Sequence, residues 1–261
     1  MNKKYFFFDI DGTLSDDATK KIVPSAKRTL ELLQQEGHFV AIATGRAYYK
    51  AKAAMEEIGI SNMVCNGGKG IVVNEKLIEN APLPKRKALA IIQEATELGY
   101  GVLVALDDSY QVYSTNHLFH QQAGLRKEPT RYTINAKLKY EEHDIYKIYV
   151  SIPKDKEHQL TLLDTVGHLR YEENYLMFQH DNKKEGILKM LKYIGGESQN
   201  VVVFGDDYND LDMFDDLWYS VAMGNACDEL KKKANYITDA NIDDGIYNAC
   251  HKMGWIKETG E

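Results

Sequence analysis

One short stretch near the amino terminus, Tyr5-Phe6-Phe7-Phe8-Asp9-Ile10-Asp11-Gly12-Thr13, places four consecutive aromatic residues directly before two carboxylates. Four apolar residues are enough for a short buried strand, and the acids end the apolar run too early for a secretory leader. In an open parallel sheet, ligands bind beyond the carboxyl ends of the strands. The stretch therefore predicts a buried core strand with carboxylates at its functional end.

Short apolar runs alternate with helical patterns in the first and last parts of the chain. Strands are expected at 5–8, 39–43, 63–65, 70–73, 200–204, 220–222 and 236–238. Helices are expected at 24–36, 47–58, 185–194, 210–215, 226–234 and 245–253. This alternation is typical of βα units around a parallel sheet. We therefore expect an α/β fold with a doubly wound, Rossmann-like sheet.

The pattern changes near Pro82 and Pro84, and the βα alternation returns only near residue 183. Between these points the sequence predicts helices at 85–98 and 155–163, with strands at 101–106, 111–114, 145–152 and 176–179. Such a series is typical of a compact antiparallel α+β unit. We expect residues 1–82 and 183–261 to form the core domain, and residues 83–182 to form an inserted α+β domain.

Composition excludes several classes of protein. Of 261 residues, 39 are acidic and 32 basic, and the resulting net charge of −7 argues against a general nucleic-acid binder. Cys65, Cys227 and Cys250 form no CxxC pair, which favours reduced thiols and a cytoplasmic location. The chain contains no run of the roughly 18 apolar residues that a membrane helix needs. We therefore expect neither nucleic acid nor a membrane as a partner.

Polar residues follow three of the predicted core strands. They are Asp9 to Thr13, then Thr44-Gly45-Arg46, then Gly205-Asp206-Asp207-Tyr208-Asn209-Asp210. If these strands are neighbours, several carboxylates converge at one edge of the sheet and repel each other unless a cation neutralises them. An all-oxygen site suits Mg²⁺, whereas no Cys/His cluster favours a softer metal. A carboxylate beside such a cation is a candidate nucleophile toward phosphorus.

These motifs resemble, in order, the four motifs of the haloacid dehalogenase superfamily. The matching segments are Asp9-Ile-Asp-Gly-Thr-Leu14, Ala43-Thr-Gly-Arg46, a lysine before Gly186-Ile187, and Gly205-Asp-Asp-Tyr-Asn-Asp210. The long insertion between the second and third motifs is similar to the C2-type cap of the Cof-type phosphatases. The segments 66–68 and 221–226 are also similar to that group. The resemblance implies a phosphatase with a Rossmann-like core and an inserted cap.

The resemblance assigns the acidic residues to a metal and to acid/base chemistry. It implies that Asp9 is the nucleophile and a Mg²⁺ ligand, and that Asp11 is the general acid/base with its backbone carbonyl on the metal. Asp206 would complete the metal site. Asp210 would support the metal or the lysine from behind.

The resemblance also assigns residues to the phosphate. Thr44 and the Gly45 backbone would hydrogen-bond the phosphoryl oxygens, and Asn209 would contact the phosphate. Arg46 is expected at the substrate or phosphate, with a contact to the cap or to a surface acid as the alternatives.

Two adjacent residues compete for the role of phosphate-binding lysine. Lys183 and Lys184 both precede Gly186-Ile187. In the family the lysine commonly stands three positions before that glycine, so the resemblance favours Lys183.

Together these expectations describe a Mg²⁺-dependent phosphatase that hydrolyses phosphomonoesters of small metabolites, such as sugar phosphates, through an aspartyl-phosphate. A phosphoryl transferase such as a phosphomutase is the nearest alternative. A regulatory phosphoacceptor protein is disfavoured because Asp11 supplies the acid/base that a stable phospho-switch would lack. We expect a monomer or weak homodimer whose partner is a small phosphorylated metabolite, and the sequence leaves the identity of that metabolite open.

Overall fold

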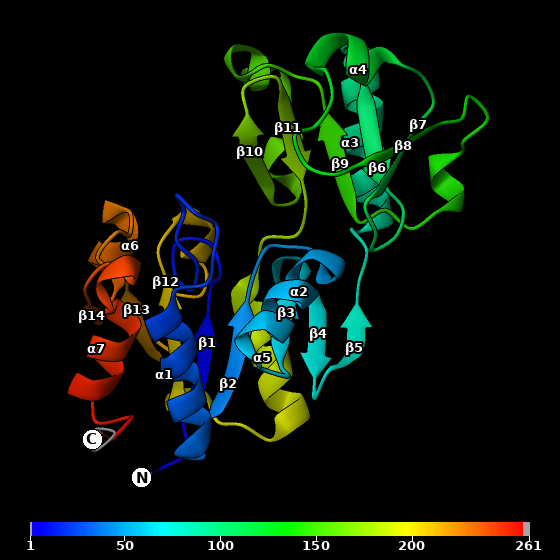
Figure 1. Cartoon of the computed structure of the whole chain (residues 1–261). Helices are drawn as coiled ribbons and strands as arrows, with labels where there is room; N and C mark the ends of the chain where they lie inside the picture. Colours follow the sequence, from blue (N-terminus) through cyan, green and yellow to red (C-terminus); the bar gives the residue numbers. More distant parts are fainter. Residues whose placement is uncertain (1, 258–261) are drawn as a thin grey trace. The chain divides into compact units, whose positions relative to one another are not determined.

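The computed structural model describes residues 2–257. The chain divides into two compact units, the first formed by Met1–Glu79 with Asn182–Glu261 and the second by Asn80–Asp181. We call the first unit the core domain and the second the inserted domain (Figure 1), and describe each by itself.

Within residues 2–257, the core domain holds one sheet of eight strands in the order β14-β13-β12-β1-β2-β3-β4-β5. β1 (Tyr5–Phe8) is central, because it pairs in parallel with both β12 (Val201–Gly205) and β2 (Phe39–Ala43). The remaining strands are β13 (Tyr219–Ala222), β14 (Tyr236–Ile237), β3 (Met63–Cys65), β4 (Gly70–Val73) and β5 (Lys76–Asn80). Pairing is parallel from β14 to β3, and the β3–β4 pair is antiparallel.

Helices cover both faces of this sheet (Figure 1). One face packs against α1 (Pro24–Gln35), α2 (Tyr48–Ile58) and α7 (Gly245–Lys252). The other packs against α5 (Lys183–Ile194) and α6 (Asp228–Lys233). Because successive strand side chains point to opposite faces, Phe6 and Phe8 enter the first core, whereas Tyr5 and Phe7 enter the second. The doubly wound α/β architecture is confirmed.

Two predicted core helices are corrected. α5 begins two residues earlier than expected, because the Asn182 side chain caps it by accepting the Glu185 backbone N–H at 2.9 Å. Lys183 therefore lies in the first helical turn. The predicted helix at 210–215 is wrong, since the chain there forms only the 3₁₀ turn η6 (Tyr208–Asp210) and further turns.

The inserted domain contains, among its described residues, a six-stranded sheet in the order β10-β11-β9-β6-β7-β8. Its strands are β6 (Val102–Ala105), β7 (Gln111–Ser114), β8 (Arg131–Ile134), β9 (Lys147–Val150), β10 (His168–Glu172) and β11 (Tyr175–Phe178). α3 (Lys85–Glu97) packs against one face, and α4 (Leu118–Ala123) contributes Phe119 to the opposite face.

The inserted domain differs from its prediction in several respects. β8, β10 and α4 were not predicted. β7 and β8 pair in parallel, so the sheet is mixed and not wholly antiparallel. The expected helix at 155–163 is replaced by two short 3₁₀ helices, η3 (Lys154–Gln159) and η4 (Leu163–Thr165).

The other 3₁₀ turns lie in both domains. η2 (Tyr140–Glu142) belongs to the inserted domain, whereas η1 (Asn66–Gly68), η5 (Ser198–Asn200) and η7 (Asn241–Asp243) belong to the core domain. In the described part of the chain, no helix combines the length and the apolar character needed to cross a bilayer.

Candidate active site

Asp9 stands directly beyond the carboxyl end of the central strand. Its backbone N–H continues the pairing of β1 with β12 by donating to the Phe204 carbonyl at 3.0 Å. This bond places the residue at the sheet edge, where the Asp9 side chain is buried with only 4% exposed. The fold thus holds a carboxylate in the interior, where an isolated charge is unfavourable without a partner.

Lys183 is the partner of this carboxylate. Its Nζ donates to Asp9 Oδ1 at 2.6 Å and also to Asp210 Oδ1, and its side chain is only 1% exposed. Burial alone would lower the pKa of Lys183, but the two carboxylates raise it above its ordinary value. The lysine is therefore a permanent buried cation at the end of β1.

Glycine at position 68 allows α5 to bring Lys183 this close. Gly68, in η1, has a φ of +93°, and a Cβ there would lie 1.8 Å from the Asn182 carbonyl oxygen. The Asn182 N–H also donates to the Gly67 carbonyl at 2.9 Å. The turn 66–68 and the start of α5 consequently pack backbone against backbone.

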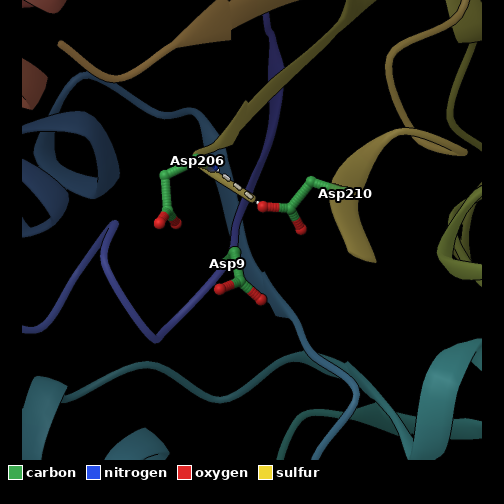
Figure 2. A group of neighbouring side chains, drawn as sticks. All are labelled: Asp9, Asp206 and Asp210. Carbon is green, nitrogen blue, oxygen red and sulfur yellow. Dashed lines mark hydrogen bonds between the residues drawn. The ribbon is translucent and has the colours of Figure 1, made fainter. Parts of the chain in front are cut away.

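Asp206 and Asp210 complete an acidic cluster with Asp9 (Figure 2). One carboxylate oxygen from each of the three residues lies within 4.8 Å of the others. Asp206 follows β12 and accepts the Thr13 hydroxyl at 2.8 Å. Asp210 has both oxygens engaged, because Oδ1 accepts from Lys183 and Oδ2 accepts the Asp206 N–H at 2.9 Å. Asp9 and Asp206 are therefore the residues that best fit a cation, with Asp210 bracing the arrangement.

The pKa values of two cluster members reflect this crowding. Burial, partly opposed by Lys183, raises the pKa of Asp9 from 3.8 to about 7. Burial, together with repulsion from Asp9 and Asp210, raises the pKa of Asp206 to about 8. A divalent cation would reverse both shifts, since it favours the ionised carboxylates. Hard carboxylate oxygens are also the donors that Mg²⁺ prefers.

Asp11 is not among the three carboxylates of this cluster, and its side chain pairs with Arg46. The Arg46 guanidinium approaches it with two nitrogens, and Nε donates to Asp11 Oδ2 at 2.9 Å. Both side chains are partly exposed, 44% for Asp11 and 32% for Arg46. Contact with the substrate, contact with the cap and pairing with a surface acid were the expectations for Arg46, and in the structure it pairs with the partly exposed Asp11, the expected acid/base.

The loop after β2 holds Thr44 buried at the same edge of the sheet. The Thr44 hydroxyl accepts the Arg46 N–H at 3.1 Å, so its own hydrogen is available to a ligand oxygen. The loop is braced by the turn 66–68, since the Asn66 N–H donates to the Arg46 carbonyl at 2.7 Å. Gly45 lies between these two residues and is half-buried.

Two further residues are placed less centrally. Asn209 is half-buried on η6, and none of the hydrogen bonds recorded among residues 2–257 joins its side chain to the acidic cluster. Lys184 is directed elsewhere, because its Nζ donates to Asp215 at 2.5 Å. Of the two adjacent lysines, only Lys183 reaches Asp9.

Asn225 belongs to the sequence motif at 221–226 but was given no role, and in the structure it contacts the turn after β1. Its Nδ2 donates to the Gly12 carbonyl at 2.8 Å, and its Oδ1 accepts the Asn241 N–H at 3.0 Å. The signal was available, because Asn225 is a polar residue just beyond the end of a core strand, β13.

A doubly wound α/β domain with a buried acid–lysine cluster beyond its strand ends defines a class of enzyme that acts on a charged ligand at the sheet edge. The family is given by comparison with known proteins. Residues 6–250 match the family model of the haloacid dehalogenase-like hydrolases. The chain belongs to this family, and it is a phosphatase.

Two relatives and one solved structure are similar to almost the whole chain. YkrA of Bacillus subtilis (strain 168) is 30% identical, over 98% of this chain and 100% of that protein. The pyridoxal phosphate phosphatase YbhA of Escherichia coli (strain K12) is 28% identical, over 94% of this chain and 97% of that protein. A crystal structure of a hypothetical protein from Geobacillus kaustophilus HTA426 aligns with a TM-score of 0.82 at 27% identity, covering 98% of this chain and 100% of that one.

Proposed function

We propose that the protein is a Mg²⁺-dependent phosphatase that hydrolyses phosphomonoesters of small metabolites through an aspartyl-phosphate on Asp9. The observation that carries this proposal is the buried Asp9–Lys183 ion pair, with Nζ and Oδ1 2.6 Å apart, beside Asp206. In this arrangement the Asp9 carboxylate would be the nucleophile, and the Lys183 ammonium would neutralise charge on the phosphoryl group. Phosphoryl transfer depends mainly on positioning and charge neutralisation.

The cluster fits a divalent cation by the chemistry of its donors. Asp9 and Asp206 would hold the ion with their carboxylates, and the Asp11 carbonyl is the third proposed ligand. Asp210, whose oxygens are occupied by Lys183 and by backbone N–H groups, would support the site from behind. When bound, the cation would supply positive charge that lowers the pKa of Asp9 and offsets charge on the phosphoryl oxygens.

In the first half of the proposed reaction, an Asp9 carboxylate oxygen attacks phosphorus and the bond from phosphorus to the leaving oxygen breaks. Asp11 gives its proton to that oxygen. In the second half, the Asp11 carboxylate takes a proton from water, whose oxygen attacks the phosphorus of the aspartyl-phosphate. Inorganic phosphate leaves and the Asp9 carboxylate is restored.

Lys183, Thr44 and the Gly45 backbone would bind the phosphoryl oxygens. The Thr44 hydroxyl accepts from the Arg46 backbone and retains its own hydrogen for this purpose. Asn209, half-buried on η6, is a further proposed contact. These groups are hydrogen-bond donors, as a phosphoryl dianion requires.

The inserted domain, predicted at 83–182 and forming the compact unit Asn80–Asp181, would act as a C2-type cap that restricts access to small substrates and excludes water during the reaction. The similarity to YbhA, named a pyridoxal phosphate phosphatase, adds that compound to sugar phosphates as a candidate substrate. We further propose a monomer or weak homodimer that acts in the cytoplasm.

The test is phosphate release from p-nitrophenyl phosphate and from a panel containing pyridoxal phosphate and sugar phosphates, each with and without Mg²⁺. Asp9→Asn should abolish release while thermal unfolding remains cooperative. Asp164→Asn is the matched control, because Asp164 is an exposed carboxylate of the inserted domain. Turnover that survives in Asp9→Asn, or in excess EDTA, would contradict the proposal. A phosphorylated product without free phosphate would indicate a transferase.

A further inference from the structure

Arg46 stands out because its side chain binds the residue proposed to move protons. Its Nε donates to Asp11 Oδ2 at 2.9 Å, and a second guanidinium nitrogen donates to Asp11 Oδ1. This two-pronged contact joins residues 35 positions apart in the sequence, one from the turn after β1 and one from the loop after β2. A fork of this kind fixes the plane of a carboxylate, which a single point charge does not do.

The backbone of Arg46 is itself held in place. Its N–H donates to the Thr44 hydroxyl at 3.1 Å, and its carbonyl accepts the Asn66 N–H at 2.7 Å. The guanidinium therefore extends from an anchored loop. By contrast, Arg28 makes a single recorded contact, to Glu31 one turn along the exposed surface of α1.

We propose that Arg46 is the positioning residue of the acid/base, orienting the Asp11 carboxylate toward the leaving group, and that it does not act by binding the phosphate. The proposal rests on the proposed function and deepens it. The fork uses one lone pair on each Asp11 oxygen, so each oxygen keeps another for the leaving group or the attacking water. Without the fork, the carboxylate could rotate and spend less time in the productive orientation.

The consequence is a defect confined to proton transfer. Arg46→Met should lower kcat by about 10- to 100-fold, the usual effect of misplacing a reacting group, while KM changes by less than about threefold. The loss should be larger for an alkyl phosphate than for p-nitrophenyl phosphate, since the nitrophenolate leaves with little help from a general acid. Arg28→Met is the matched control and should retain wild-type kcat and KM.

A double-mutant cycle separates positioning from substrate binding. In an Asp11→Asn background, Arg46→Met should change kcat by less than about twofold, because the group it positions is already absent. If Arg46 instead binds the phosphate, KM rises and the full factor persists in that background. That result would overturn the proposal while leaving the proposed function intact.

Two more outcomes complete the test. Arg46→Lys keeps the charge but not the fork, so it should resemble Arg46→Met, and full activity in Arg46→Lys would overturn the proposal. If Asp11→Asn keeps wild-type kcat on alkyl phosphates, Asp11 is not the acid/base, and the proposed function and the positioning role both fail. Each variant is checked by circular dichroism and thermal unfolding, and Arg46→Gln replaces Arg46→Met if the latter does not fold.

Discussion

Proton binding and cation binding compete at the acidic cluster, so the affinity for Mg²⁺ should fall steeply as the pH is lowered from 8 to 6. In the metal-free protein, burial raises the pKa of Asp9 to about 7 and that of Asp206 to about 8. A cation needs both carboxylates in the ionised form. Lys183 stays protonated throughout this range, because Asp210 and Asp9 raise its pKa above the ordinary value.

The magnitude follows from these two pKa values. At pH 8, Asp9 is about nine-tenths ionised and Asp206 about half ionised, whereas at pH 6 the fractions are about one-tenth and one-hundredth. The doubly ionised fraction therefore falls by about 500-fold, and the dissociation constant for Mg²⁺ should rise by the same factor. This corresponds to about 3 to 4 kcal/mol of binding free energy, at about 1.4 kcal/mol for each factor of ten.

Isothermal titration calorimetry with Mg²⁺ at pH 6, 7 and 8 measures the effect directly. Repeating each titration in buffers of different ionisation enthalpy counts the protons released, which should approach two for each ion bound at pH 6. Asp206→Asn should abolish most of the binding, while Asp164→Asn, at an exposed carboxylate of the inserted domain, should retain both the affinity and its pH dependence. A dissociation constant that changes less than about fivefold between pH 6 and 8 would refute the reasoning.

Two further outcomes test the packing around the site, and a third tests a buried histidine at the opposite end of β1 and β2. Lys183→Met leaves buried carboxylates unpaired and should lower the free energy of unfolding in urea by about 3 to 5 kcal/mol, whereas Lys184→Met, at a partly exposed pair, should lower it by less than about 1 kcal/mol. Gly12→Ala should abolish Mg²⁺-dependent phosphate release, because Gly12 has a φ of +76° and its added Cβ would lie 2.0 Å from Asp206 Oδ2. Burial lowers the pKa of His38 below its ordinary value of 6.5. The contribution of neutral His38 to the free energy of unfolding should therefore be complete above pH 6.5 and be lost as the pH falls below that value. Thermal melts from pH 7 to 5 should show a decrease in melting temperature that is absent in His38→Asn.

The strands that the hydrophobic pattern of the sequence did not predict are all edge strands. β5, β8 and β10 were not predicted, and each lies at the edge of its sheet. An edge strand is partly exposed on both faces, so it lacks the apolar run of a buried strand and the alternation of a half-buried one. β5 shows this directly, since Leu77 and Ile78 are adjacent and both exposed. The central strands were predictable because burial on both faces demands consecutive apolar residues.

In the candidate site, the positions of the residues could be predicted from the sequence, but the directions of their side chains could not. The rule that ligands bind beyond the ends of parallel strands predicts that Asp9 and Asp206 lie close together, and the structure brings them into one cluster. That rule gives the location of a residue and says nothing about the direction of its side chain. Asp11 turns toward Arg46, and Asn225 reaches back to Gly12, through contacts that depend on rotamers and loop geometry. Such contacts join residues far apart in the chain. Its position beyond a core strand can place Asn225 near the site, but local sequence does not identify the partner that its side chain contacts.

Burial of the acidic cluster makes the ionisation of Asp9 depend on a bound cation. Asp9, Asp206 and Asp210 face one lysine, Lys183, so the fully ionised cluster carries a charge of −2 from three carboxylates and one ammonium. A phosphate dianion would be repelled by this charge. In the metal-free protein, burial and, to a smaller extent, the neighbouring carboxylates raise the pKa of Asp9 and Asp206, so the cluster is only partly ionised at neutral pH. A protonated Asp9 is a poor nucleophile. In the proposed reaction, the Asp9 nucleophile is therefore fully ionised at neutral pH only when a compensating cation is bound. The positive charge of that cation would also allow the site to bind phosphate.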